Sequence, residues 1–294
     1  MAKKKCTKGF ACGKSCIAKN KLCRVELSPE ASAVLDEKRG TGKTLDSYIQ
    51  ASTEFLDSVP MGDLEGQIEK ARKDLREKYS DKKDRKLRDL EAQRQERILA
   101  ALKKLGSVDT PKIRWERENE FFGRNLTPDE RDVAEQQVNQ FMELVGSNPF
   151  GNLSLGFVKE SDRAWARKVP SLVNVGNGKT STMFHELGHH VEYNNPELAI
   201  AAVEFRDRRA TSTEVVTREK EGYGANEQFL QGKYIDGYMG KVYGNGATEV
   251  ISMGLEWFTT PYRMDSLQKK RPGAIQLHPR LSCKEQRVTM RQRV

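Results

Sequence analysis

The chain has 294 residues, of which 36% are apolar and 32% are charged. This length suits one large domain or two smaller ones, and it is sufficient for a buried core. No apolar run reaches about 18 residues, so we expect no membrane-spanning helix and no membrane partner. The basic start MAKKK is followed by no apolar segment, which favours a cytoplasmic location over secretion by a signal peptide.

The net charge of +9 is concentrated at the two ends of the chain. Residues 1–24 carry eight Lys or Arg and no acid, and residues 263–294 carry a net +7, so the intervening part is acidic. Basic ends on an acidic body predict contact with nucleic acid or an acidic protein face, although tails that are merely solvated would have the same composition. Phe10 is the one aromatic residue in the first segment, so the stacking platform typical of single-stranded nucleic-acid binding is missing.

Four of the five cysteines lie in the first segment, at Cys6, Cys12, Cys16 and Cys23. Neighbouring lysines favour the thiolate form, which is the form that binds zinc. The C-x5-C-x3-C-x6-C spacing differs from the C-x2-C pairs of zinc ribbons, so two disulfides or four reduced thiols are alternatives. A cytosolic setting disfavours the disulfides. We therefore predict a basic, cysteine-rich knuckle over residues 1–24 as a second possible metal site.

A long charged helical arm is predicted within residues 25–109, with a short helix over 46–58 and the main helical material over 62–107. The stretch from Ser80 to Lys86 contains no apolar residue, so the main part is either one helix of about 45 residues or a hairpin that turns near Ser80. The narrow apolar stripes resemble those of a coiled coil, which predicts self-association or a partner, although a solvated arm without a specific role is an alternative. The stripes consist of Leu64, Ile68, Ala71, Leu75 and Tyr79, then Leu87, Leu90, Ile98, Leu102 and Leu105.

A well-marked helix follows the arm. Thr127 can cap it, Pro128 suits its first position, and Glu130 completes a capping box. The apolar periodicity then continues to Gly146, where we expect the helix to end.

Two strand-like segments come next, at residues 152–160 and 163–175, and both are interrupted by Gly or Pro. Another helix follows, which Thr180 or Ser181 can cap and which Asn194-Asn195-Pro196 ends. The order helix, strands, helix predicts an α+β domain over residues 110–262, with a small mixed sheet.

The second of these helices contains the sequence His185-Glu186-Leu187-Gly188-His189, an H-E-x-x-H motif. Residues four apart lie on one face of a helix, so His185 and His189 can bind one zinc ion. Glu186 lies beside that face, where it can take a proton from a zinc-bound water. Gly188 lacks a side chain at a point where another backbone can pack closely. His190 lies on a different face and is expected at the surface or behind the ligands.

A catalytic zinc site needs a third protein ligand. The H-x-x-G-x-x-H continuation of the metzincins is absent after His189. The segment NGATEVISMGLEWF predicts a helix that begins after Gly246, and Glu249 on this helix is the preferred third ligand. Glu256 on the same face and His278, the fourth histidine, are the alternatives.

A catalytic hydrogen-bond donor is also expected, because such sites stabilise an oxyanion. Tyr238 and Tyr243 precede the glutamate helix and are the candidates, although packing in a loop would also explain each tyrosine. Glycines surround them, which predicts a mobile loop that could cover the site.

The segments HELGHH and TEVISMGLEW resemble the zincin metallopeptidases of the gluzincin type, over residues 150–260. The resemblance implies a zincin-like fold with an active-site helix, Zn²⁺ held by His185, His189 and Glu249, and Glu186 as general base. It also implies that an edge strand, here in AWARKVPSLVNV, pairs with a peptide or protein substrate. The chain departs from the family in its long interval before Glu249 and in lacking the N-E-x-x-S-D form.

The N-terminal segment resembles a cysteine-rich leader of phage-encoded and cyanobacterial proteins, and this resemblance implies a location in a bacterial host cell or in a virion. Two functions are therefore expected as alternatives: zinc-dependent hydrolysis of peptide bonds, or a structural virion or assembly role that uses the arm and the basic ends of a retained zincin fold. A toxin-like effector with the same chemistry is a third. The residues that carry the leader resemblance are Cys6, Gly9, Cys12, Gly13, Ser15, Cys16, Ile17 and Cys23.

Overall fold

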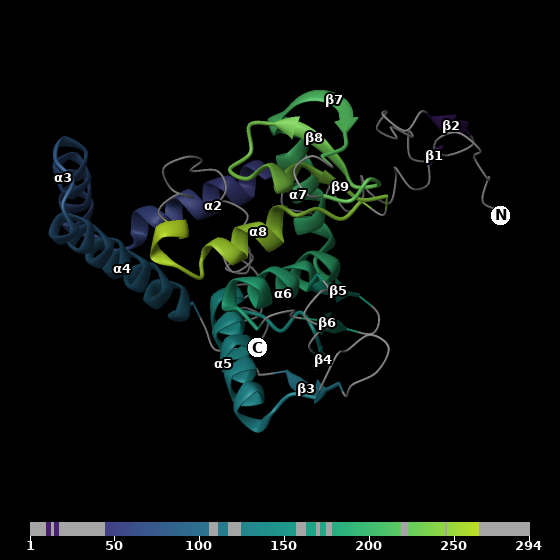
Figure 1. The fold of residues 1–294 in the computed structure, drawn as a ribbon, viewed down its shortest axis with the longest axis horizontal. Helices are drawn as coiled ribbons and strands as arrows, with labels where there is room; N and C mark the ends of the chain where they lie inside the picture. Colours follow the sequence, from purple (N-terminus) through teal and green to yellow (C-terminus); the bar gives the residue numbers. More distant parts are fainter. Residues whose placement is uncertain are drawn as a thin grey trace, which may run out of the picture. The chain divides into compact units, whose positions relative to one another are not determined.

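The computed structural model describes a mixed α+β protein (Figure 1). The chain forms two compact units. One unit comprises Met1–Leu45 and Pro196–Val250, and the other comprises Asp46–Asn195 and Ile251–Val294. The structure describes residues 10–12, 15–17, 45–105, 111–116, 125–156, 163–168, 171–174, 178–218, 223–244 and 246–264.

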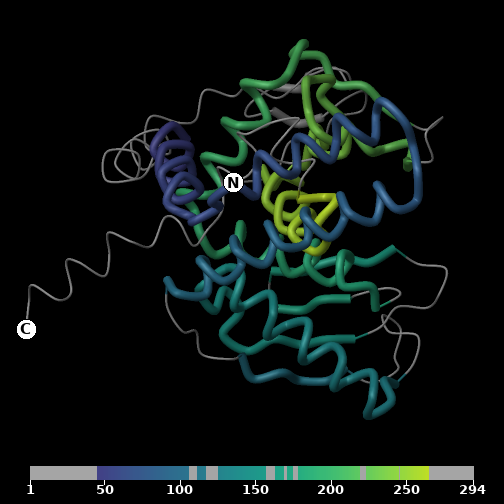
Figure 2. The backbone as a smooth tube through the Cα atoms, turned by 90° about the vertical axis from the view of Figure 1, so that its left-hand side faces the viewer, coloured from purple at the N-terminus to yellow at the C-terminus, as the bar shows by residue number. Residues whose placement is uncertain are grey.

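The arm is a helical hairpin, which decides between the two predicted arrangements. Helix α2 (Leu45–Ser58) is followed by α3 (Leu64–Glu77) and α4 (Asp81–Lys103), and the chain reverses between the last two (Figure 2). The turn includes Ser80. The side chain of Ser80 accepts a hydrogen bond from the Lys83 N–H at 3.3 Å and so caps the start of α4.

The apolar stripe of α3 is buried against α4, so the chain itself supplies a partner for it. Leu64, Ile68, Ala71 and Leu90 form a buried cluster. Tyr79, which the periodicity places in the stripe, is 67% exposed because α3 has already ended. Self-association through the hairpin stays a prediction.

The second half of α4 packs on the rest of its unit. Ile98 and Leu102 are buried, and the Gln95 side chain donates a hydrogen bond to the Phe258 carbonyl at 2.7 Å. This half of the arm therefore packs against other residues of its unit and is not a free arm.

That layer is a four-stranded sheet in the order β3-β4-β6-β5, so the predicted small mixed sheet is confirmed. Strand β4 lies in the first predicted strand segment, the second segment contains both the edge strand β5 and β6, and β3 was not predicted. Strands β3, β4 and β6 are parallel, and β5 runs antiparallel to β6. The strands are β3 (Lys112–Trp115), β4 (Asn152–Gly156), β5 (Trp165–Arg167) and β6 (Leu172–Asn174).

Helix α5 (Pro128–Val145) and helix α6 (Thr180–Asn194) lie beside this sheet (Figure 1). The predicted capping box of α5 is present, and the helix ends at Gly146 in the left-handed conformation. Phe141 of α5 and Phe184 of α6 meet edge to face at 5.3 Å, which joins the two helices through buried aromatic surface.

The other unit contains helix α7 (Pro196–Arg209) and a three-stranded antiparallel sheet. Its strands are β7 (Ala210–Val216), β8 (Gln228–Gly232) and β9 (Lys241–Val242), and a 3-10 turn, η2 (Gly237–Gly240), precedes β9. In the glycine-rich segment expected as a mobile loop, Gly237–Gly240 form the 3-10 turn and Lys241–Val242 form β9. A side chain at Gly240 would collide with the Leu230 carbonyl, so close packing explains this glycine.

Within residues 1–24 the structure describes only β1 (Phe10–Cys12) and β2 (Ser15–Ile17), an antiparallel pair. Cys6 and Cys23 lie outside the described residues, so the four-thiol site stays a prediction, as does contact of the basic ends with an anionic partner. Among the described helices, none has the length and apolar character needed to cross a bilayer.

Candidate metal centre

Helix α6 presents the two motif histidines on one face. The rings of His185 and His189 have centroids 5.1 Å apart and are nearly perpendicular. The helix begins without a side-chain cap, so the capping role predicted for Thr180 or Ser181 was wrong. The first turn is held by α5 instead, because the Gln137 amide donates to the Gly178 carbonyl at 3.2 Å and to the Thr180 hydroxyl at 3.1 Å.

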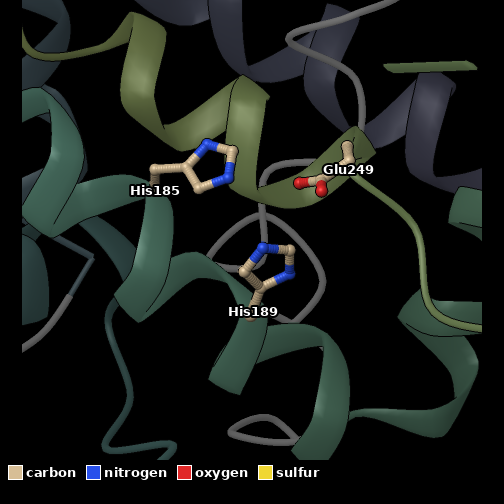
Figure 3. Close-up of side chains that lie close together, drawn as sticks. All are labelled: His185, His189 and Glu249. Atoms are coloured by element: carbon tan, nitrogen blue, oxygen red, sulfur yellow. The ribbon is translucent and has the colours of Figure 1, made fainter. Parts of the chain in front are cut away.

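Glu249 completes a group of three possible metal ligands. One ligand atom from each of His185, His189 and Glu249 lies within 4.8 Å of the other two, and the three side chains point toward a common space (Figure 3). Glu249 is only 1% exposed and directly precedes helix α8 (Val250–Trp257), which starts slightly later than predicted. Residues 251–257 of this helix belong to the same unit as α6.

The donor set fits a metal of the zinc type. Two imidazoles and one carboxylate are a common ligand set of catalytic zinc, and a tetrahedral ion with bonds of about 2.0–2.2 Å keeps its ligand atoms roughly 3.4 Å apart. A group within 4.8 Å therefore needs side-chain shifts of about 1 Å to close on an ion. The three residues could hold a metal ion.

Close packing of α6 against α8 holds these elements together. A Cβ atom at Gly188 would lie 2.7 Å from the Ser252 Cα, which is shorter than real contacts allow. Ser252 is fully buried. The predicted close approach of another backbone at Gly188 is confirmed, and that backbone is α8.

We expect Gly188→Ala to lower the free energy of unfolding by about 1–3 kcal/mol, because the new methyl group must displace α8. Gly254→Ala is the matched control: Gly254 lies on α8 itself, and its Cβ would meet nothing within 4 Å. This control should be neutral or more stable by up to about 1 kcal/mol, since alanine favours helix. Urea unfolding measures both values, and equal stabilities would contradict the close contact.

Glu256 does not belong to the ligand group but supports it. Its Oε2 lies 3.2 Å from His185 Nδ1, and its other oxygen contacts Arg263. Burial raises the pKa of Glu256, but the contacts with His185 and Arg263 outweigh burial and leave that pKa below its usual value. A carboxylate at Nδ1 fixes the ring and directs Nε2 to a metal. His278, the other alternative ligand, lies outside the described residues.

The two predicted catalytic tyrosines contact other residues of the chain. Tyr243 donates a short hydrogen bond to Glu249, and Tyr238 accepts one from Lys241 at 2.9 Å. Burial and the adjacent Glu249 raise the pKa of Tyr243 above its usual value, so it stays a donor. A role for either hydroxyl at an oxyanion stays a prediction.

Glu186 and His190 are four residues apart and lie on the same side of the ligand face. At roughly 100° per residue, Glu186 flanks the two ligands while His190 points well away from them. Glu186 is 6% exposed. His190 is buried between Phe150 and Tyr193 rather than at the surface, and burial lowers its pKa to about 4.

Sequence reasoning missed three residues around the ligands. Arg263 contacts Glu256, and Lys241 contacts both Glu227 and Glu249. No motif marks them, because each acts through a partner that the fold brings near.

Comparisons of the chain with family models, with curated proteins and with solved structures find no match.

Proposed function

We propose that this protein is a zinc-dependent peptidase. The observation that carries the proposal is the convergence of Glu249 with the two histidines of an H-E-x-x-H helix. A metal held only for stability is usually enclosed by four protein ligands, whereas three ligands leave a position for chemistry. The neighbouring Glu186 is a proton acceptor that a purely structural site does not need.

His185, His189 and Glu249 would hold the zinc ion, which supplies Lewis acidity toward a peptide carbonyl and an attacking water. Glu186 accepts the proton of that water and then donates it to the leaving amine. Glu256 holds the His185 ring in position throughout. Burial of Glu186 and Glu249 limits competing water around these charges.

Strand β5 is the proposed docking strand for substrate. It lies at the edge of the four-stranded sheet, pairs with β6 on one side only among the described strands, and packs near α6. An extended peptide can add to such an edge through backbone hydrogen bonds. This arrangement supports a protein or peptide in extended form as the substrate.

Metal removal tests the proposal. We expect the purified full chain to contain at least about one equivalent of zinc and to cleave fluorescein-labelled, denatured casein. Treatment with a chelator should abolish cleavage, and one equivalent of Zn²⁺ should restore it. Elemental analysis and product detection by mass spectrometry measure both properties. Cleavage that survives complete removal of metal would refute the proposed chemistry.

A further inference from the structure

A buried lysine, Lys241, lies next to the candidate ligand Glu249. Lys241 is 8% exposed, and its ammonium lies 2.5 Å from a Glu227 oxygen and 3.9 Å from a Glu249 oxygen. The same ammonium donates a hydrogen bond to the Tyr238 hydroxyl at 2.9 Å. Its Nζ also lies 4.8 Å from the ring centroids of both Tyr238 and Tyr243. Two carboxylates and two aromatic faces thus surround one cation.

The strands of the smaller sheet hold this cluster in place. Phe229 of β8 pairs with Lys241 of β9, which sets the lysine close to the residues that precede β8. Glu227 is one of these, and its second oxygen accepts a hydrogen bond from the Gly224 N–H at 2.8 Å. Glu227 is therefore oriented independently of Lys241, and it fixes the position of the ammonium.

The cluster brings charges of both signs close together. Glu227 and Glu249 supply two negative charges, and Lys241 supplies one positive charge that contacts both. A buried carboxylate without a counter-ion is strongly unfavourable, so the lysine permits Glu249 to be buried in the metal-free protein. A metal ion at Glu249 would then meet a second cation that contacts the same carboxylate.

We propose that Lys241 is an internal counter-ion of Glu249 that competes with the metal for this carboxylate and so sets the metal affinity. The proposal rests on the metal site described above. Glu227 tunes the competition, because it draws the ammonium away from Glu249. The pair Lys241–Glu227 would keep the metal-free protein folded while keeping zinc exchangeable.

Zinc titration of four full-length variants against a competing chelator tests the proposal. We expect Lys241→Met to bind zinc about 10-fold more tightly, because the competing charge is gone. We expect Glu227→Gln to bind zinc about 10-fold more weakly. With Glu227 neutral, Glu249 is the carboxylate left for the Lys241 ammonium to pair with, so the competition with zinc increases. Lys241→Arg retains the charge and should stay within about 3-fold of the wild type. Lys233→Met, at an exposed position, is the control for loss of a lysine.

Thermal unfolding supplies a second measurement. Without metal, Lys241→Met should melt below the wild type, and added zinc should raise its melting temperature by more than it raises that of the wild type. A lysine that served only packing or ligand orientation would weaken zinc binding in both Lys241→Met and Glu227→Gln. That result, or unchanged affinities, would overturn the proposal while zinc-dependent cleavage by the wild type still stood. A wild type that binds no zinc would overturn this proposal and the metal site together.

Discussion

Glu186→Gln is expected to lower the rate of peptide cleavage by about 10²- to 10⁴-fold, which is the range for loss of a general base. The amide has nearly the same shape as the carboxylate but cannot accept a proton. Glu186 is not among the three grouped ligands, so zinc content should be unchanged. Steady-state cleavage of a labelled peptide, together with elemental analysis of the same samples, measures both quantities.

Glu192→Gln is the matched control for this variant. Glu192 lies on the same helix and is also buried, at 2% exposure, but it is six positions farther along. We expect this variant to retain activity if its melting temperature shows that it is folded. Equal cleavage by Glu186→Gln and the wild type, with zinc bound in both, would exclude Glu186 as the base and would refute the proposed reaction.

Features encoded by neighbouring residues could be predicted from the sequence. The i, i+4 spacing of His185 and His189 depends only on helix geometry, and the capping box at Thr127 and Glu130 depends on a single turn. The turn near Ser80 was visible as a gap in the apolar pattern. Glu249 was predictable because a short helix with one acidic face follows the motif.

Features that depend on distant partners could not be predicted. Glu256 is 71 residues from His185, and its contact depends on the crossing of α6 and α8, which Gly188 permits. Strand β3 has four residues and forms only because β4 pairs with it. The ion pair of Lys241 with Glu227 likewise results from the pairing of β8 and β9.

Glu249→Gln is expected to weaken zinc binding by at least about 100-fold, because a neutral amide replaces the one charged ligand of the group. With zinc at 100 times the wild-type Kd, binding stabilises the wild type by about 2.7 kcal/mol, whereas a 100-fold weaker variant gains only about 0.4 kcal/mol. The zinc-induced rise in melting temperature should therefore nearly vanish. The glutamine retains an oxygen that can accept the hydrogen bond from Tyr243.

Glu256→Ala tests whether Glu256 supports the ligand His185 or is itself a metal ligand. Glu256 contacts His185 rather than the ligand group as a whole, so its loss should weaken zinc binding by about 10- to 100-fold, which is the range for outer-shell partners. The order of affinities is then wild type, Glu256→Ala and Glu249→Gln. If Glu256→Ala binds zinc more weakly than Glu249→Gln, Glu256 is the third ligand and the assignment of Glu249 is wrong. The same chelator competition decides between the two glutamates, because it ranks all three proteins on one scale.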